Sequence, residues 1–218
     1  YWIMMAYVPV PGIGLPDLTV AEKNWAHYLD SFLIPGRLWK YTWDPEGFLS
    51  TLPAIVSGLI GMWAGYILLK KEDLKIRLNQ LFFIGFILLF LGDAMQWVFP
   101  FNKNLWSSSF TLFMGGIGML SLAAFSYYFD LNQSRFKFQF AHVFGVNSIF
   151  AYSMSSLLTV IFYSSKWFGF ALNQEFMGLW GNIGLPLKLG SLVYALLYVL
   201  VIWLPTYYLF KKKIYLKL

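Results

Sequence analysis

The chain has 218 residues, of which 59% are hydrophobic, 21% aromatic and only 12% charged, and its formal net charge is +6. A soluble domain carries about 25% charged residues, so this shortfall and the long apolar runs place the chain among membrane proteins. The basic residues flank apolar runs, as contacts with lipid head groups require, which excludes nucleic acid as the partner. The absence of cysteine excludes disulfides and zinc–thiolate sites, and two distant histidines do not make a metal site.

Residues 1–8, YWIMMAYV, are too short to cross a membrane, which takes about 20 residues. They have neither the basic start nor the small-residue cleavage site of a signal peptide. We interpret them as the end of a helix and expect the chain to be the C-terminal part of a longer protein. Residues 9–51 are predicted to form an outer loop, because PVPGIGLP breaks regular structure and the residues after it are polar. Within the loop, residues 19–32 predict a short helix at the membrane surface.

Apolar runs then predict five complete membrane spans between residues 52 and 210. The expected bounds are about 52–69, 81–98, 107–129, 140–163 and 187–210. The predicted fold is all-α, a polytopic transmembrane helical bundle of five spans plus the partial N-terminal helix, in one domain over residues 1–218. Gly61 and Gly65 have the small-xxx-small spacing that favours close packing between membrane helices.

The orientation follows from the basic residues in the short connections. They gather at residues 70–77, 135–137 and 211–213, which all fall on one side if the five spans are counted as above. Short basic segments mark the cytoplasmic side. Residues 211–218 are therefore predicted to be a cytoplasmic tail, and residues 9–51, the turn near residue 103 and the loop 164–186 are predicted to face the outer side.

Two carboxylates, Asp44 and Glu46, stand just before the first span. Either could accept a proton from an amine or a hydroxyl if burial raised its pKa towards neutrality. The alternative is the start of a helix, with Asp44 as N-cap and Pro45 at the first helical position.

A second polar group lies in the short connection between the second and third spans. Asn102, Asn104 and Trp106 could fix a polar ligand, and Lys103 could hold an anionic group. The alternative is a tight polar turn with an interfacial tryptophan and a solvated lysine.

Some polar residues lie inside or beside the spans. Asn147 and Ser148, in the fourth span, could line a polar cavity or form hydrogen bonds between helices. Asp93 is an ionisable group in the second span, so it is either functional or placed in the wet interface. His27 and His142 are interpreted as interfacial histidines, although His142 could also transfer a proton.

Three stretches together resemble the heparan-α-glucosaminide N-acetyltransferase family and its bacterial relatives. They are Trp43–Thr51 (WDPEGFLST), Phe101–Ser109 (FNKNLWSSS) and Gly145–Tyr152 (GVNSIFAY). The first two are specific together and the third is weaker. The resemblance covers essentially the whole chain but only the C-terminal part of the family.

The resemblance implies an enzyme that moves an acetyl group from cytoplasmic acetyl-CoA to the amine of a glucosamine unit across the membrane, with acetyl-CoA as co-substrate and no metal. It implies a bacterial inner-membrane location. It also implies a catalytic histidine in an N-terminal half that is missing here, and neither His27 nor His142 matches that motif. Candidate residues at matching positions are Asp44 and Glu46 for catalysis, and Asn102, Lys103, Asn104, Trp106, Asn147 and Ser148 for substrate binding.

Two other functions stay open: a membrane transporter or binding protein without catalysis, and an O-acyltransferase that acts on envelope glycans. The expected partners are membrane lipids, the amino-sugar or glycan acceptor and the missing N-terminal half. A homodimer is left open, and no nucleic acid is expected.

Overall fold

The computed structural model describes residues 1–34, 36, 38, 44, 47–131, 139–164, 169 and 171–216. These residues form helices and turns, with one isolated bridge between Val10 and Gly14 and no strand among them. The predicted all-α class is confirmed. The chain divides into two compact units, Tyr1–Arg135 and Phe136–Leu218, and each is described by itself.

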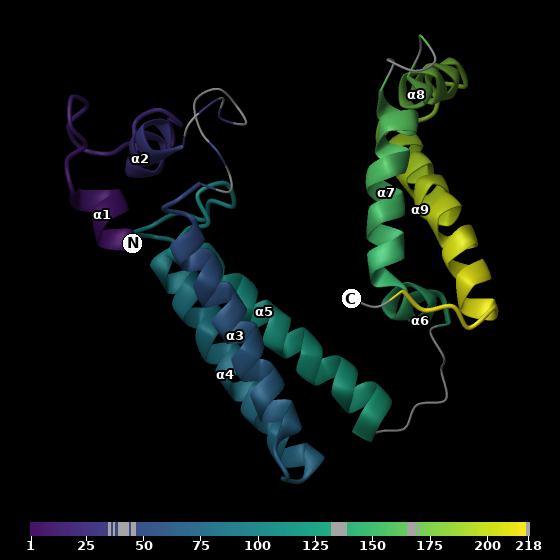
Figure 1. Ribbon diagram of the computed structural model, residues 1–218, viewed down its shortest axis with the longest axis horizontal. Helices are drawn as coiled ribbons and strands as arrows, with labels where there is room; N and C mark the ends of the chain where they lie inside the picture. The colour runs from purple at the N-terminus through teal and green to yellow at the C-terminus, as the bar shows by residue number, and fades with distance from the viewer. Residues whose placement is uncertain are drawn as a thin grey trace. The chain divides into compact units, whose positions relative to one another are not determined.

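In the first unit, α3, α4 and α5 run alongside one another, and α1 and α2 cover the end at which α3 begins (Figure 1). The bounds are α1 Trp2–Tyr7, α2 Trp25–Leu33, α3 Thr51–Leu69, α4 Leu74–Met95 and α5 Ser108–Ser126, with a π-helical extension at Tyr127–Leu131. Side-chain caps explain where two of these helices begin. At the start of α2, the side chain of Asn24 accepts a hydrogen bond from the backbone nitrogen of His27. At the start of α4, the side chain of Asp73 accepts one from the backbone nitrogen of Lys75. Capping at Asp73 starts α4 seven residues before the predicted span.

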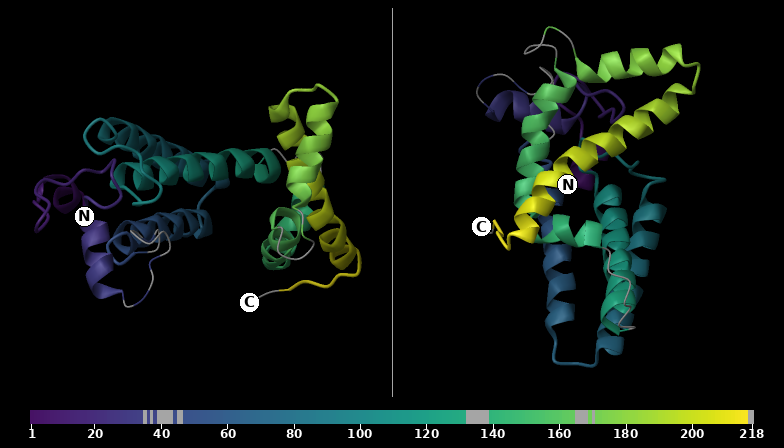
Figure 2. Two further views of the ribbon diagram at one scale, coloured as in Figure 1. Left: turned by 90° about the horizontal axis from the view of Figure 1, so that it is seen from above. Right: turned by 90° about the vertical axis from the view of Figure 1, so that its right-hand side faces the viewer.

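In the second unit, α7 and α9 pack against each other, and α6 lies across the lower end of α7 (Figures 1 and 2). The bounds are α6 Gln139–Val146, α7 Ser148–Tyr163, α8 Leu172–Asn182 and α9 Leu187–Lys211. Helix α8 lies within the segment 164–186, where only a loop was expected.

Four helices of the described chain are long and apolar enough to cross a membrane: α3, α4, α5 with its extension, and α9. The predicted fourth span is broken, because α6 and α7 meet at an angle of 88°. Asn147 lies at the break with φ −126° and ψ 38°, outside the helical region. Within the described residues, the helices that could cross a membrane number up to five if this bent pair counts as one span, and four otherwise.

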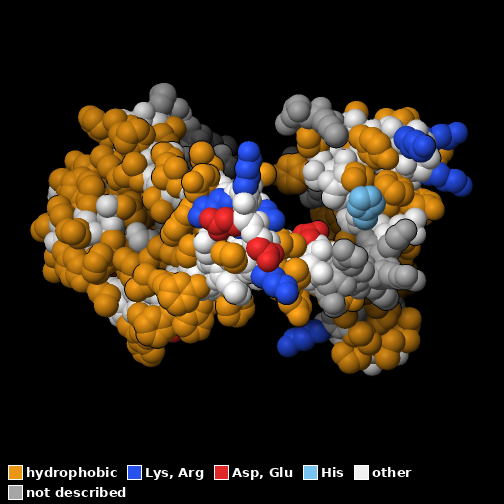
Figure 3. All heavy atoms as spheres, turned by 90° about the horizontal axis from the view of Figure 1, so that it is seen from below, with side chains coloured by type: hydrophobic (Ala, Val, Ile, Leu, Met, Phe, Trp, Pro, Cys, Tyr) orange, Lys and Arg blue, Asp and Glu red, His pale blue; other side chains and the backbone are white. Residues whose placement is uncertain are grey.

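Charged side chains gather at the connection between α3 and α4, within a surface that is mostly apolar (Figure 3). The guanidinium of Arg77 donates to the carbonyl of Leu68, which satisfies a group at the end of α3. Lys70 Nζ lies 4.0 Å from Glu72 Oε1 and donates to Gln80 Oε1 at 3.2 Å. This end of the first unit is thus charged, whereas the helices that lead to it present apolar side chains.

Helices α4 and α5 are the most closely packed pair in the first unit, and glycines allow their approach. A Cβ on Gly92 would lie 2.4 Å from the backbone nitrogen of Phe113. A Cβ on Gly116 would lie 2.4 Å from the backbone nitrogen of Leu89. Side chains larger than hydrogen are therefore excluded at both positions without a shift of the backbone.

The close contact predicted for Gly61 and Gly65 is wrong within the described chain, since no described atom lies within 4 Å of a Cβ built on either residue. Helix α3 instead contacts α5 through Ile60, whose Cδ1 would lie 3.0 Å from a Cβ on Gly115. Burial of this branched apolar side chain selects the face of α3 that packs, and the glycines lie elsewhere on the helix.

Candidate functional site

The connection from α4 to α5 is a tight turn that uses its own polar groups. The side-chain oxygen of Asn102 accepts from the backbone nitrogens of Asn104 at 2.9 Å and Leu105 at 3.1 Å. The backbone nitrogen of Asn102 donates to the hydroxyl of Ser107 at 3.0 Å, and the nitrogen of Ser107 donates back to the carbonyl of Asn102 at 3.0 Å. Such an asparagine-centred turn fixes the backbone, so the predicted tight polar turn is confirmed.

Trp106 is the most constrained residue of this turn. Its φ is +53°, in the left-handed region that bulky residues rarely adopt. Its indole nitrogen donates to the hydroxyl of Ser57 on α3 at 2.9 Å, and its ring packs edge-on against Phe110 at 5.4 Å. These two contacts turn the indole towards the helices. Lys103 and Asn104, on the same turn, are exposed.

Helices α1 and α2 pack against this turn. The hydroxyl of Tyr1 donates to the carbonyl of Leu105. A buried apolar cluster joins both helices to the turn and to the start of α3; its members are Met5, Ala26, Leu49, Phe99 and Leu105. Burial, and secondarily the charge of Asp30, raise the pKa of Tyr1. The turn and α2 thus belong to one packed end of the first unit.

A hollow of about 120 Å³ lies between the turn and the residues that precede α2. Asn24, Asn102 and Asn104 contribute polar groups to its walls. Asn24 is 1% exposed, and its side-chain oxygen accepts from the backbone of His27 at 3.0 Å. The volume is below the range of roughly 300–1,000 Å³ that is usual for small-molecule sites.

Asp30 on α2 is a buried carboxylate that was not among the candidates predicted from the sequence. Its side chain is 0% exposed, and Oδ1 accepts from the backbone nitrogen of Phe48 at 2.8 Å. Its second oxygen, Oδ2, has no hydrogen-bond partner in the described part of the chain. A Cβ on Gly47 would lie 2.0 Å from that oxygen, so any larger residue there would require the Asp30 carboxylate to move.

The electrostatic surroundings of Asp30 bring three titratable groups together. Burial raises the pKa of its carboxyl above the ordinary value, and the hydrogen bond from Phe48 opposes this. The negative charge of Asp44 raises the pKa further, whereas His27 lowers it. His27 and Asp44 are both half-buried. The burial of Asp30 could have been expected from its spacing to the apolar Ala26, because residues four apart share one face of a helix.

Asp44 lies near Asp30 but does not start a helix. Helix α3 begins at Thr51, with Ser50 as its N-cap, so the interpretation of Asp44 as N-cap is wrong. The carbonyl of Gly47 accepts from the hydroxyls of Ser50 at 2.9 Å and Thr51 at 3.0 Å, and these bonds fix the turn that enters α3. Glu46 and Pro45 lie outside the described residues.

Asn147 and Ser148 lie in the second unit. Asn147 is 0% exposed; its amide nitrogen donates to the carbonyl of Ile214 at 3.2 Å, and its oxygen accepts from the nitrogen of Leu216 at 3.1 Å. The side chain thus ties the break between α6 and α7 to the segment that follows α9. Ser148 is exposed at the first turn of α7. Substrate binding by these two residues stays a prediction.

The remaining polar candidates have local contacts. Asp93 is exposed near the end of α4 and accepts from Gln96 Nε2 at 2.6 Å. His142 is exposed on α6 and packs edge-on against Phe210 at 5.4 Å. Among the described residues, no three carboxylate or histidine side chains are arranged to hold a metal ion.

The site that the geometry offers is therefore the covered end of the first unit, where Asp30 has His27 and Asp44 as charged neighbours and α2 packs against the Asn102–Ser107 turn through Ala26 and Leu105. Comparison with models of protein families and with curated proteins finds no match to the chain.

Proposed function

We propose that the chain is a membrane-embedded acyltransferase module that transfers an acetyl group from acetyl-CoA to the amine of an amino-sugar acceptor. One observation carries the proposal. A half-buried histidine, His27, and the buried carboxylate of Asp30 interact electrostatically at the end of the unit that also holds the Asn102–Ser107 turn. Acyl transfer requires a proton acceptor and hydrogen-bond donors at one site.

The chemistry assigns a task to each group. The acceptor amine attacks the thioester carbonyl, a C–N bond forms, the C–S bond breaks, and the amine loses a proton. Although His27 does not match the histidine motif that the resemblance implies, we assign it this role within the chain: His27 takes that proton and returns it to the departing thiolate of CoA. The carboxylate of Asp30, three residues later on α2, supplies a neighbouring negative charge. The exposed Lys103 and Asn104 offer donors to the carbonyl oxygen as it gains negative charge.

The charge pattern supports the orientation that this reaction needs. Lys70, Lys71 and Arg77 lie at the connection between α3 and α4, at the opposite end of these helices from His27. Basic residues in a short connection favour the cytoplasmic side. The candidate site would then face the outer side of a bacterial inner membrane, with the C-terminus in the cytoplasm, and the pantetheine arm of cytoplasmic acetyl-CoA would pass between the spans to reach it.

The test uses membranes that hold the full-length gene product, labelled acetyl-CoA and glucosamine, and it measures N-acetylglucosamine. His27→Gln and Asp30→Asn should lower the rate by about 100-fold or more, as expected for loss of a general base. Glu22→Gln, an exposed carboxylate that precedes α2, is the matched control and should leave the rate unchanged. Equal rates in all three variants would remove His27 and Asp30 from the site.

The same membranes separate the alternatives. Uptake of labelled glucosamine without acetylation would favour a transporter, and acetylation of hydroxyls in place of amines would favour an O-acyltransferase of envelope glycans. Both readouts are compared with membranes that lack the protein.

A further inference from the structure

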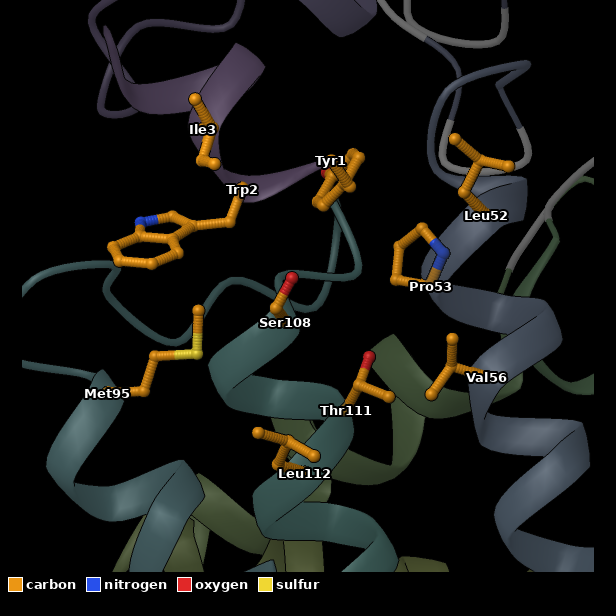
Figure 4. A pocket seen from close by; sticks show the side chains of 10 residues that line it. All are labelled: Tyr1, Trp2, Ile3, Leu52, Pro53, Val56, Met95, Ser108, Thr111 and Leu112. Carbon is orange, nitrogen blue, oxygen red and sulfur yellow. The ribbon is translucent and has the colours of Figure 1, made fainter.

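A second site lies beside α5, below α1, and the acyltransferase proposal does not use it. The cavity measures about 600 Å³, which is within the range of ordinary ligand sites. Side chains of α1, α3 and α5 wall it, with Met95 of α4 on the remaining side (Figure 4). Most of the lining is apolar, and two hydroxyls, those of Ser108 and Thr111, point into the space from the first turn of α5 (Figure 4).

Thr111 is the polar group that needs a partner. It is 2% exposed, and its hydroxyl has no hydrogen-bond partner within the described chain. A buried hydroxyl without a partner costs about 1–3 kcal/mol, so a ligand atom that accepts its hydrogen bond would be favoured there. Thr206 on α9 shows the usual solution, since its buried hydroxyl donates to the carbonyl of Ile202 at 2.7 Å.

The rim of the cavity indicates which ligand enters. Three of its apolar side chains are largely exposed: Ile3 at 67%, Leu52 at 52% and Val56 at 42%. Leu52 and Val56 belong to α3, and Thr111 to α5, and both helices are long and apolar enough to cross a membrane. An opening bordered by such side chains faces hydrocarbon, and the first turns of spanning helices lie near the membrane interface.

The depth of Thr111 matches one part of a lipid. The ester carbonyls of a glycerolipid lie at the boundary between head groups and hydrocarbon, where tyrosine and tryptophan also gather. Tyr1 and Trp2 line the same cavity. We propose that this cavity binds one acyl chain of a membrane glycerophospholipid, with the ester carbonyl accepting a hydrogen bond from the hydroxyl of Thr111.

The experiment measures lipid retained by the full-length gene product. The protein is purified in detergent, incubated with deuterium-labelled dioleoyl phosphatidylglycerol, and examined by native mass spectrometry during stepwise dilution. The expected result is one labelled lipid held per chain. Thr111→Val keeps the shape but removes the hydroxyl, and should lower retention about threefold to tenfold, the effect of one net hydrogen bond. Val56→Trp fills the cavity and should abolish retention.

Two matched variants control for general effects. Thr206→Val removes a buried hydroxyl that already bonds to its own helix, and Leu196→Trp adds an indole at a position on α9 that is 61% exposed. Both should retain lipid like the unchanged protein. Absence of any retained lipid, or equal retention by Thr111→Val and Thr206→Val, would overturn the proposal. The measurement does not depend on acetyl transfer, so the two proposals fail separately.

Discussion

The contact between α4 and α5 and the glycine-bearing face of α3 have similar small residues and different surroundings. In the first region, Gly92 and Gly116 lie against the backbone of the neighbouring helix. In the second, Gly58, Gly61 and Gly65 meet no described atom within 4 Å of a built Cβ. The difference teaches that spacing of small residues allows a close approach but does not select the face that is used. Larger apolar side chains, such as Ile60 in α3, make that selection.

The largest effect is expected from filling the closest contact. Gly116→Ala should lower the free energy of unfolding by about 3 kcal/mol, because the new methyl group would overlap the backbone of Leu89. Gly61→Ala, in the open region, should be neutral or stabilise by up to about 1 kcal/mol through helix propensity. Thermal unfolding in detergent measures both. If Gly61→Ala instead lowered the free energy of unfolding more than Gly116→Ala does, the glycine-bearing face of α3 would be packed against a partner.

A somewhat smaller effect is expected at the polar close contact between Gly47 and Asp30. Gly47→Ala should cost about 2 kcal/mol, since the methyl group would overlap the carboxylate. The double variant Gly47→Ala with Asp30→Ala should recover part of that loss, because the overlapping oxygen is gone. Additive losses in the double variant would contradict direct contact. At Gly116 the added methyl group overlaps backbone atoms, so no second side-chain substitution should restore stability. At Gly47 it overlaps a side chain, so the second substitution should restore part of it.

Loss of the indole hydrogen bond should have a smaller effect. Ser57→Ala leaves the indole nitrogen of Trp106 without its partner on α3 and should cost about 1 kcal/mol. Ser155→Ala on α7, where the hydroxyl bonds to the carbonyl of Tyr152 within its own helix, is the matched control and should change stability less. The unfolding temperatures of both variants give the answer, and equal losses would show that the bond between α3 and the turn adds no stability.

The smallest effect is a pH slope from Asp30. Its pKa in the folded chain is raised above the ordinary value of 3.8. At a pH between 3.8 and the raised pKa, the folded protein therefore keeps a proton that the unfolded chain has released. Stability therefore falls as the pH rises through this window. Relative to Asp30→Asn, the unfolding temperature of the unchanged protein should decrease as the pH rises above about 4. Asp17, whose pKa is lowered by its hydrogen bonds with Thr19, gives the opposite sign when Asp17→Asn is the reference.

Local signals predicted much of the fold. The first span was expected at residues 52–69 and α3 runs from Thr51 to Leu69, because a continuous apolar run in a membrane must satisfy its backbone as a helix. The tight turn at Asn102 was also predictable, since its hydrogen bonds join residues no more than five apart. The break at Asn147 was not, because its side chain bonds to residues 67 and 69 positions later.

Some features of the candidate site also follow from the sequence, and others depend on the tertiary structure. The sequence alone determined a helical membrane protein with a polar turn at one end, because apolar length and turn chemistry act over a few residues. Tertiary structure alone decided that Asp30 would be buried, with Gly47 against one carboxylate oxygen and Phe48 donating to the other. Burial of a carboxylate depends on backbone that lies 17 and 18 residues away in the chain, and the folded packing of that end brings the two together.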